Sequence, residues 1–177
     1  MNQKQLETLR KNNEESRDFV KSCFRFALMI ILKDKSNKKI TVTRLCNIAG
    51  VSRMAFYRNY RSVEDVLTDE IKTFVLSIAA KITTDVYENW LVVFQQAEAN
   101  REDLEAIIGA GFEQKILDIF FSLLPENEES RTIQAIWLSL FYSLIIKWLK
   151  DKKPKKAEDM ARLAYKYTKN IPLVSKE

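Results

Sequence analysis

Four side chains that can bond to a nucleic acid lie within one short stretch of the chain. Arg53, Tyr57, Arg58 and Asn59 fall within residues 53–59. An arginine can make two hydrogen bonds to guanine, an asparagine can make two to adenine, and a tyrosine hydroxyl can reach a phosphate. The same residues would also suit the solvated face of an ordinary basic helical hairpin. The secondary structure predicted around these residues must therefore decide between nucleic-acid binding and an ordinary basic hairpin.

Local signals around this stretch predict two short helices joined by a tight turn. Thr41 is placed to cap a helix over residues 42–49, and Ser52 to cap a second over residues 53–60. Gly50 suits the left-handed residue that ends a helix. Preceded by a longer helix, this is a helix-turn-helix arrangement, whose last helix can enter a DNA major groove about 12 Å wide.

The charge distribution also favours a polyanion-binding N-terminal part. Residues 1–63 carry 14 Lys and Arg against 5 Asp and Glu, a net charge of +9, whereas residues 64–177 carry a net charge of −4. A basic first part on a mildly acidic remainder is typical of a nucleic-acid-binding domain joined to a domain with another task.

Several function classes are disfavoured by the residue types that the sequence lacks. Histidine is absent, and three glycines at positions 50, 109 and 111 form no phosphate-binding loop. We therefore expect no enzyme, no metal site and no cofactor. Cys23 and Cys46 are expected to be buried, reduced thiols. No signal peptide and no apolar run of roughly 18 residues is found, which predicts a cytoplasmic protein without a membrane partner.

The predicted fold class is all-α. Gly and Pro number three each, too few for the turns of a sandwich or barrel. Residues 1–13 are expected to be a frayed polar arm. The spacing of Phe19, Cys23, Phe26, Ala27 and Ile30 predicts a stripe that packs the first helix on the core. About nine helices are expected, over residues 14–35, 42–49, 53–60, 63 onward, 84–99, one or two across 101–124, 130–150 and 156–170.

Residues 40–67 resemble the DNA-binding domain of the TetR-type (TetR/AcrR) transcriptional regulators. The matching residues are Thr41, Leu45, Ala49, Gly50, Val51, Ser52, Phe56, Tyr57, Tyr60, Ser62, Glu64 and Leu67. The resemblance implies an N-terminal three-helix domain over residues 1–63, with its helix-turn-helix motif at about residues 41–60. It also implies a C-terminal helical domain over residues 64–177 for effector binding and dimerisation.

The sequence departs from the family pattern at positions that commonly contact DNA. Met54 and Ala55 stand where the family often has Gly or Pro followed by Thr, and Asn59 stands where His is common. Val63 replaces a Lys that often contacts a phosphate, and we expect Arg61 to compensate for the lost contact. The operator specificity of relatives therefore does not transfer to this chain.

Residue type and resemblance together predict a set of DNA contacts. Arg53, Met54 and Ala55 are expected to face base edges, and Thr43 and Arg44 to face the backbone or a flanking base. The full predicted set is Lys38, Lys39, Thr41, Thr43, Arg44, Ser52, Arg53, Met54, Ala55, Tyr57, Arg58, Asn59 and Arg61. The residues of this segment expected in the core are Leu45, Ile48, Val51 and Phe56.

Large apolar side chains in the C-terminal part suit a core, an effector pocket or a dimer interface. Apolar pockets between helices are common small-molecule sites. The predicted pocket residues are Trp90, Phe94, Phe112, Phe120, Trp137 and Phe141. The resemblance implies a four-helix bundle between two subunits, with predicted interface residues Ile133, Trp137, Leu140, Leu144, Trp148, Met160, Leu163 and Tyr167.

These patterns predict a homodimeric DNA-binding transcriptional regulator, in this family more often a repressor than an activator. It would bind a near-palindromic double-stranded operator and be released by a small apolar effector. The alternative is a co-regulator of the same family whose C-terminal domain docks a partner protein. An enzyme is the third class, and the missing residue types disfavour it.

Overall fold

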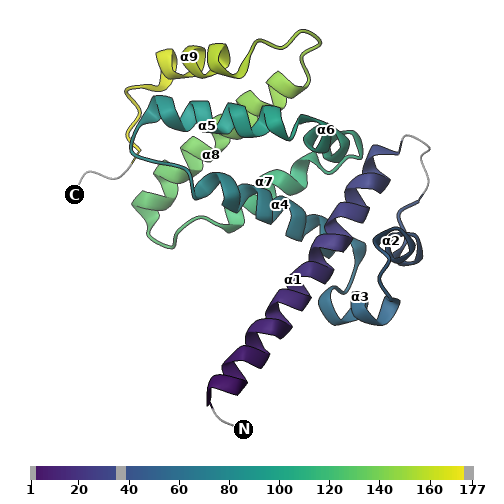
Figure 1. The fold of residues 1–177 in the computed structure, drawn as a ribbon. Coiled ribbons are helices and arrows are strands. Elements are labelled where there is room, and N and C mark those ends of the chain that lie inside the picture. Colours follow the sequence, from purple (N-terminus) through teal and green to yellow (C-terminus); the bar gives the residue numbers. More distant parts are fainter. Residues whose placement is uncertain (1–2, 35–38, 174–177) are drawn as a thin grey trace. The chain divides into compact units, whose positions relative to one another are not determined.

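The computed structural model describes residues 3–34 and 39–173, with side chains from Lys11 onward. These residues form nine α-helices and no strand (Figure 1). The predicted all-α class is confirmed. The helices are α1 (Gln3–Lys33), α2 (Val42–Ala49), α3 (Arg53–Asn59), α4 (Val63–Ala79), α5 (Val86–Ala99), α6 (Arg101–Gly109), α7 (Glu113–Ser122), α8 (Glu128–Leu149) and α9 (Ala157–Thr168).

The contacts divide the chain into two compact units, residues 1–70 and 71–177. We call the first unit the head and the second unit the body. Helix α4 begins in the head and ends in the body. Each unit has its own buried residues, so each is described by itself.

The head is built around aromatic and aliphatic side chains from its four helices. Phe24 of α1, Leu45 of α2, Phe56 of α3 and Val66 of α4 are fully buried. The rings of Phe24 and Phe56 meet edge to face at 5.3 Å between centroids, a favoured geometry for aromatic pairs. The shared core fixes α2 and α3 against α1.

The first helix begins earlier than predicted. Residues 3–13, expected to be a frayed arm, belong to α1. They contain no Gly or Pro, and Lys11 Nζ lies 3.9 Å from Glu15 Oε1 one helical turn away. Nothing in this segment breaks a helix, so the helix continues through it.

The predicted buried stripe of α1 is wrong at three of its five positions, whereas Ala27 is fully buried as predicted. Phe19 and Phe26 are 69% and 70% exposed, and Ile30 is 42% exposed. The opposite face carries the fully buried Phe24 and Leu28. Because α1 is apolar on two faces, helical periodicity alone could not identify the face that packs on the core.

Two further burial predictions in the head did not hold. Cys23 is only half-buried, whereas Cys46 is buried as expected. Ile48 is 38% exposed instead of lying in the core. It lies three residues after Leu45, at the edge of the buried face of a short helix.

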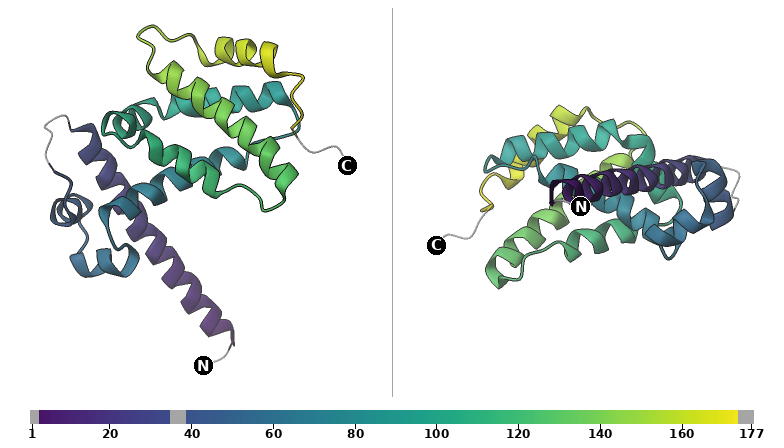
Figure 2. Two further views of the ribbon diagram at one scale, coloured as in Figure 1. Left: turned by 180° about the vertical axis from the view of Figure 1, so that it is seen from behind. Right: turned by 60° about the horizontal axis from the view of Figure 1, so that its bottom comes forward.

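In the body, α9 lies along α5 (Figures 1 and 2). Ala157, Ala161 and Ala164 form one small-residue face of α9, and all three are buried. Short side chains allow the two helices to approach closely. Trp90 of α5 is fully buried, and its Nε1–H donates to Thr168 Oγ1 at 2.7 Å.

The two remaining tryptophans of the body are buried in the same way. Trp137 donates from Nε1 to the Pro172 carbonyl and Trp148 to the Lys155 carbonyl, each at 2.8 Å. Both rings belong to the cluster that contains Trp90 and Phe94. Satisfying each indole N–H removes the free-energy cost of burying an unpaired donor.

Among the described residues, one helix, α8, is long and apolar enough to cross a membrane by length and composition. A core helix passes the same test, and α8 supplies Trp137 and Trp148 to the core of the body. Of its most apolar stretch, 22% is buried. Within the part of the chain that the structure describes, the rest of this stretch is half-buried or exposed.

Candidate nucleic-acid interface

The exposed face of α3 carries the side chains best suited to read a base edge. Arg53 and Arg58 are exposed, Met54 is 66% exposed and Tyr57 is 62% exposed. Phe56 between them points into the core. Helix α3 therefore presents two arginines, a methionine and a tyrosine to solvent. The buried ring of Phe56 packs the helix on the core.

Backbone caps fix where α3 begins and how it follows α2. Thr41 Oγ1 accepts from the Arg44 N–H, and Ser52 Oγ accepts from the Ala55 N–H. Gly50 ends α2 with φ 65°, and both its own N–H and that of Val51 donate to the Cys46 carbonyl. These bonds satisfy helix-end groups, and the positive φ gives the sharp turn that brings α3 across α2.

The other predicted contacts around α2 differ in availability. Thr43 and Lys39 are exposed, and Ala55 is half-buried. Lys38 lies outside the described residues. Arg44 Nη2 lies 2.6 Å from Asp34 Oδ2, so an opposite charge within the chain partly neutralises this guanidinium.

Both ends of the Asn59 side-chain amide are engaged within the head. Its Nδ2 donates to the Ala55 carbonyl at 2.8 Å, and its Oδ1 accepts from Arg17 Nε at 3.3 Å. A contact between Asn59 and a base would have to compete with these bonds for the same amide. In this arrangement the amide joins α3 to α1.

A carboxylate of the chain itself occupies the start of α4. Asp65 Oδ2 accepts from the backbone N–H groups of Arg61 and Ser62, and Ser62 Oγ accepts from the Asp65 N–H. The backbone bond from Arg61 leads the influences that lower the pKa of Asp65. These N–H groups are therefore already satisfied by an anion, while the exposed Arg61 side chain remains beside them.

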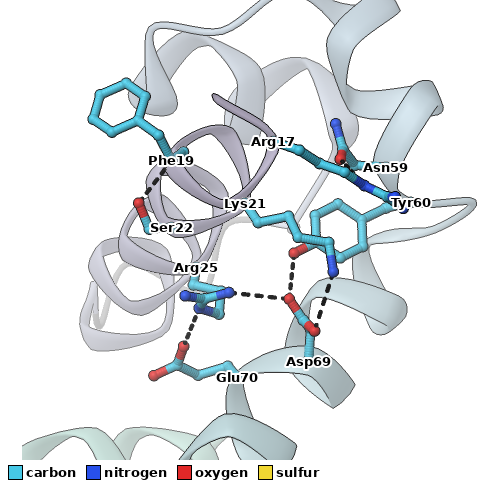
Figure 3. A network of polar contacts seen from close by, with 9 residues as sticks. All are labelled: Arg17, Phe19, Lys21, Ser22, Arg25, Asn59, Tyr60, Asp69 and Glu70. Carbon is cyan, nitrogen blue, oxygen red and sulfur yellow. Dashed lines mark hydrogen bonds and ion pairs between the residues drawn. The ribbon is translucent and has the colours of Figure 1, made fainter. Parts of the chain in front are cut away.

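A polar network that the sequence did not reveal links α1 to α4 (Figure 3). Asp69 Oδ2 accepts from the Tyr60 hydroxyl at 2.6 Å and from Arg25 Nη1 at 3.1 Å, and Asp69 Oδ1 lies 3.5 Å from Lys21 Nζ. Arg25 Nε also lies 3.2 Å from Glu70 Oε2. The carboxylate of Asp69 thus binds one tyrosine and two basic side chains. Both basic residues belong to α1, which is far from Asp69 in the sequence.

The network shifts the ionisation of its own members. Burial raises the pKa of Tyr60 most strongly, and the hydrogen bond to Asp69 raises it further. Burial alone would raise the pKa of Asp69, but the Tyr60 hydroxyl and the charges of Lys21 and Arg25 lower it below its ordinary value. At neutral pH the network therefore consists of a neutral phenol and an ionised carboxylate.

The sequence contained one usable signal for this network. Lys21 and Arg25 are one turn apart on α1, and Asp69 and Glu70 are adjacent acidic residues on α4. Their opposite charges are compatible with helix-to-helix pairing. The sequence alone did not show that these faces meet, because that depends on how α1 and α4 cross.

The predicted pocket residues of the body fall into two groups and one single residue. Trp90 and Phe94 are fully buried, Trp137 is nearly so, and all three belong to the core. Phe120 and Phe141 instead line an apolar cavity of about 40 Å³, and Phe112 is half-buried outside that lining. The first group lies in the core because α5 packs against α9 there.

The cavity has one polar lining side chain. Tyr142 contacts Glu113 at 3.4 Å from its hydroxyl to Oε1, and Lys150 Nζ lies 2.6 Å from Glu113 Oε2. Burial, followed by the charge of Glu113, raises the pKa of Tyr142. The space is far smaller than the roughly 300–1,000 Å³ of ordinary ligand sites.

The predicted interface residues separate into three groups. Trp137 and Trp148, expected to face a partner, lie in the core of their own chain because their indole N–H groups find oxygen acceptors there. Leu163 is 41% exposed and Tyr167 is 73% exposed. The half-buried members of the set are Ile133, Leu140, Leu144 and Met160.

Comparisons with known proteins identify solved structures of similar fold. Neither a protein-family model nor a curated protein matches the chain. A TetR transcriptional regulator from Streptococcus agalactiae 2603V matches with a TM-score of 0.54 and 17% identity, over 89% of this chain and 97% of that one. A TetR-family transcriptional regulator from Streptomyces coelicolor matches with a TM-score of 0.52 and 11% identity, over 84% and 81%.

The chain has the fold of these TetR regulators. It is all-α, with a helix-turn-helix part followed by a helical C-terminal part. At such low identity the likeness concerns the fold alone. The chemistry of this chain must therefore be argued from its own residues.

Proposed function

We propose that this chain is a DNA-binding transcriptional regulator whose α3 enters the major groove. The exposed face of α3 is the observation that supports this proposal. Its solvent-accessible side chains are Arg53, Met54, Tyr57 and Arg58, and the helix is capped at Ser52. In this proposal the DNA-binding domain spans residues 1–63, and residues 64–177 form the effector and dimerisation domain. We expect the protein to act in the cytoplasm.

Three side chains on this face have a defined task in the proposal. Arg53 bonds a guanine, Met54 packs on a thymine methyl, and Tyr57 reaches a phosphate. Thr43 and Lys39 contact the backbone beside α2. Asn59 acts from within the head by holding α3 against Arg17, which is a different role from base recognition.

The proposed regulator is a homodimer that pairs through α8 and α9. Support comes from the apolar surface of these helices, where Ile136 is 46% exposed, Leu163 41% and Tyr167 73%. Two-fold pairing would present two α3 helices to successive major grooves about 34–36 Å apart and require a near-palindromic operator.

We further propose that the regulator is a repressor released by a small apolar effector. The apolar lining between α4, α5, α7 and α8 supports this idea. A ligand releases the operator only if it binds the DNA-incompetent state more tightly. Because the cavity is about 40 Å³, effector binding would have to widen it.

The small cavity also favours a second candidate. In this alternative the chain is a co-regulator whose body docks a partner protein and takes no small ligand. The exposed apolar side chains of α8 and α9 would then serve that partner.

Selection of DNA from a random duplex library tests the proposal. We expect enrichment of a near-palindromic site whose half-sites lie about one helical turn apart. Arg53→Ala should relax the preference at one position of each half-site. Arg162→Ala, on an exposed arginine of α9, should leave it unchanged. Failure to enrich any sequence would contradict a base-reading head.

A further inference from the structure

Helix α3 is anchored in the core of the head by a single ring. Of its seven residues, all of which the structure describes, Phe56 alone is buried, and it packs on Phe24 of α1. A helix of this length spans about 10 Å, so one ring near its middle does not set its tilt. Other groups must therefore fix the direction in which α3 points.

Two adjacent residues at the C-terminal end of α3 supply such groups. Asn59 Oδ1 accepts from Arg17 Nε at 3.3 Å. Tyr60 caps the helix and is 6% exposed, and its hydroxyl donates to Asp69 Oδ2 at 2.6 Å. A hydroxyl bond of this length to a carboxylate is a strong, charge-assisted one. The end of α3 is thus bonded to α1 through Asn59 and to α4 through Tyr60.

The bond at Tyr60 is the firmer of the two, because its acceptor is held from several sides. Asp69 also accepts from Arg25 Nη1 at 3.1 Å and lies 3.5 Å from Lys21 Nζ. Lys21 Nζ in turn lies 5.5 Å from the centre of the Tyr60 ring, within the range of a cation–π contact. Figure 3 shows these three side chains around Asp69. A carboxylate fixed in this way restrains the phenol that is bonded to it.

The basic residues of α1 that take part lie on one face of the helix. Arg17, Lys21 and Arg25 are four residues apart from one another, which is about one helical turn. Each contacts the end of α3 or the first half of α4. These three charges of the basic N-terminal part therefore act within the head, whereas the side chain of Arg53 is exposed.

We propose that Tyr60 is a positioning residue for base recognition, and that its hydroxyl bond to Asp69 sets the tilt of α3. This inference rests on the proposed function, because it concerns how Arg53 reaches its base. Arg53 lies seven residues from Tyr60, about 10 Å along the helix. A tilt of about 10° at the Tyr60 end would move the Arg53 backbone by about 2 Å, enough to lose hydrogen bonds to a base edge.

Loss of positioning differs in its effect from loss of a phosphate contact. A displaced Arg53 no longer reads its base, but the attraction between the basic head and the DNA backbone is unchanged. Removal of the Tyr60 hydroxyl should therefore weaken binding to the operator and spare binding to random DNA. The Tyr60 ring packs against Phe24 and Phe56, and a phenylalanine in its place keeps these apolar contacts.

Tyr60→Phe in the full-length chain tests the proposal, because it removes one oxygen atom and keeps the ring. We expect operator affinity to fall about tenfold and random-duplex affinity to change by less than about twofold. Tyr142→Phe is the matched control, since the Tyr142 hydroxyl also contacts a carboxylate, that of Glu113 in the body. It should leave both affinities unchanged. Equal losses on both duplexes after Tyr60→Phe, or no loss on either, would overturn the proposal.

Two double variants check how the effect reaches the base. With Arg53→Ala in place, Tyr60→Phe should cost little more operator affinity, because the contact that Tyr60 positions is already gone. With Asp69→Ala in place, Tyr60→Phe should likewise add little, because the bond between them is already broken. Additive losses in either pair would contradict positioning of Arg53 through Asp69.

Amide hydrogen exchange of the free chain separates this inference from the proposed function. Tyr60→Phe should speed exchange at residues 56–60 more than in α1 or α2. An equal rise throughout the head would indicate general destabilisation and would overturn the proposal. If the unmodified chain selects no DNA sequence, the proposed function fails, while a rise confined to α3 still supports Tyr60 as the residue that fixes this helix.

Discussion

Tyr60 in the head and Trp90 in the body each bury an aromatic ring and bond its polar atom, but to different kinds of partner. The Tyr60 hydroxyl donates to the carboxylate of Asp69, which also holds Lys21 and Arg25. The Trp90 N–H donates to the neutral hydroxyl of Thr168. At these two rings the head therefore uses an ionised acceptor, whereas the body uses a neutral one.

The two units can be followed separately in one experiment. All three tryptophans lie in the body, at positions 90, 137 and 148. Tryptophan fluorescence consequently reports on the body, while far-ultraviolet circular dichroism reports on the helices of both units. A variant in one unit therefore leaves the other unit as its internal control.

Removing a buried ring from the body should have the largest effect. Phe94 is fully buried and lies 5.8 Å from Trp90 and 5.4 Å from Trp148 between ring centroids. Phe94→Ala should lower the free energy of unfolding by about 3–5 kcal/mol in the fluorescence-detected urea transition. Phe56→Ala is the matched change in the head, and its effect should appear mainly in circular dichroism. Similar fluorescence shifts for both variants would mean that the units unfold as one.

Removing the shared carboxylate of the head should have the next largest effect. Asp69→Ala leaves the buried Tyr60 hydroxyl and Arg25 without this acceptor, at a cost of about 1–3 kcal/mol. Asp69→Asn keeps an oxygen for Tyr60 and should cost less. Urea unfolding followed by circular dichroism measures both. Glu70→Gln, which leaves Asp69 intact, should be the mildest, and an equal cost for all three variants would contradict the central role of Asp69.

Acid should weaken the head before the body. The folded pKa of Asp69 is lowered, so its stabilising contribution is complete above the unfolded value of about 3.9 and is lost as pH falls through the folded pKa. A pH titration should therefore show loss of circular dichroism ahead of the fluorescence change. Asp69→Asn should remove most of that separation, and coincident transitions in the unmodified chain would contradict the expectation.

Substitution of the turn glycine tests backbone strain without touching a side-chain contact. Gly50 has φ 65°, and a Cβ there would meet no atom within 4 Å. Gly50→Ala should cost about 1–2 kcal/mol through the left-handed conformation alone. Thermal unfolding compared with Gly50→Asn checks this, because asparagine tolerates that conformation better. A larger loss for Asn than for Ala would contradict strain as the cause.

The smallest stability effect is expected at Arg17. Its bond to Asn59 Oδ1 is 3.3 Å long and exposed, so Arg17→Ala should change the free energy of unfolding by no more than about 0.5 kcal/mol. Operator affinity should fall more than stability does, because α3 loses its link to α1. Parallel measurement of urea unfolding and operator binding separates the two. A loss of stability without a loss of affinity would contradict this positioning role.

The sequence predicted local structure well where one residue type decides it. Gly50, Ser52 and Thr41 fix the turn and the two helix starts through their own backbone or hydroxyl groups. These effects extend over three or four residues, so neighbouring sequence contains all the information needed. The same reasoning correctly predicted that Phe56 would be buried.

Prediction failed where the outcome depends on which surfaces meet. Helix α1 has two apolar faces, and the sequence favoured the one that is exposed. Trp137 and Trp148 suited an interface by size, but α8 turns them toward Trp90 and the Pro172 and Lys155 carbonyls. The Asp69 network was missed for the same reason, because α1 and α4 are separated by two helices in the sequence.

Fluorescence anisotropy across a salt series tests the central claim that the exposed face of α3 reads DNA. The selected operator and a random duplex of equal length should be titrated with the unmodified chain, Arg53→Ala and Arg162→Ala. We expect Arg53→Ala to lose about 1–3 kcal/mol of binding free energy on the operator and little on random DNA. Arg162→Ala should match the unmodified chain. Equal losses on both duplexes with a reduced salt slope would mean that Arg53 contacts phosphate only, which would contradict base reading by α3.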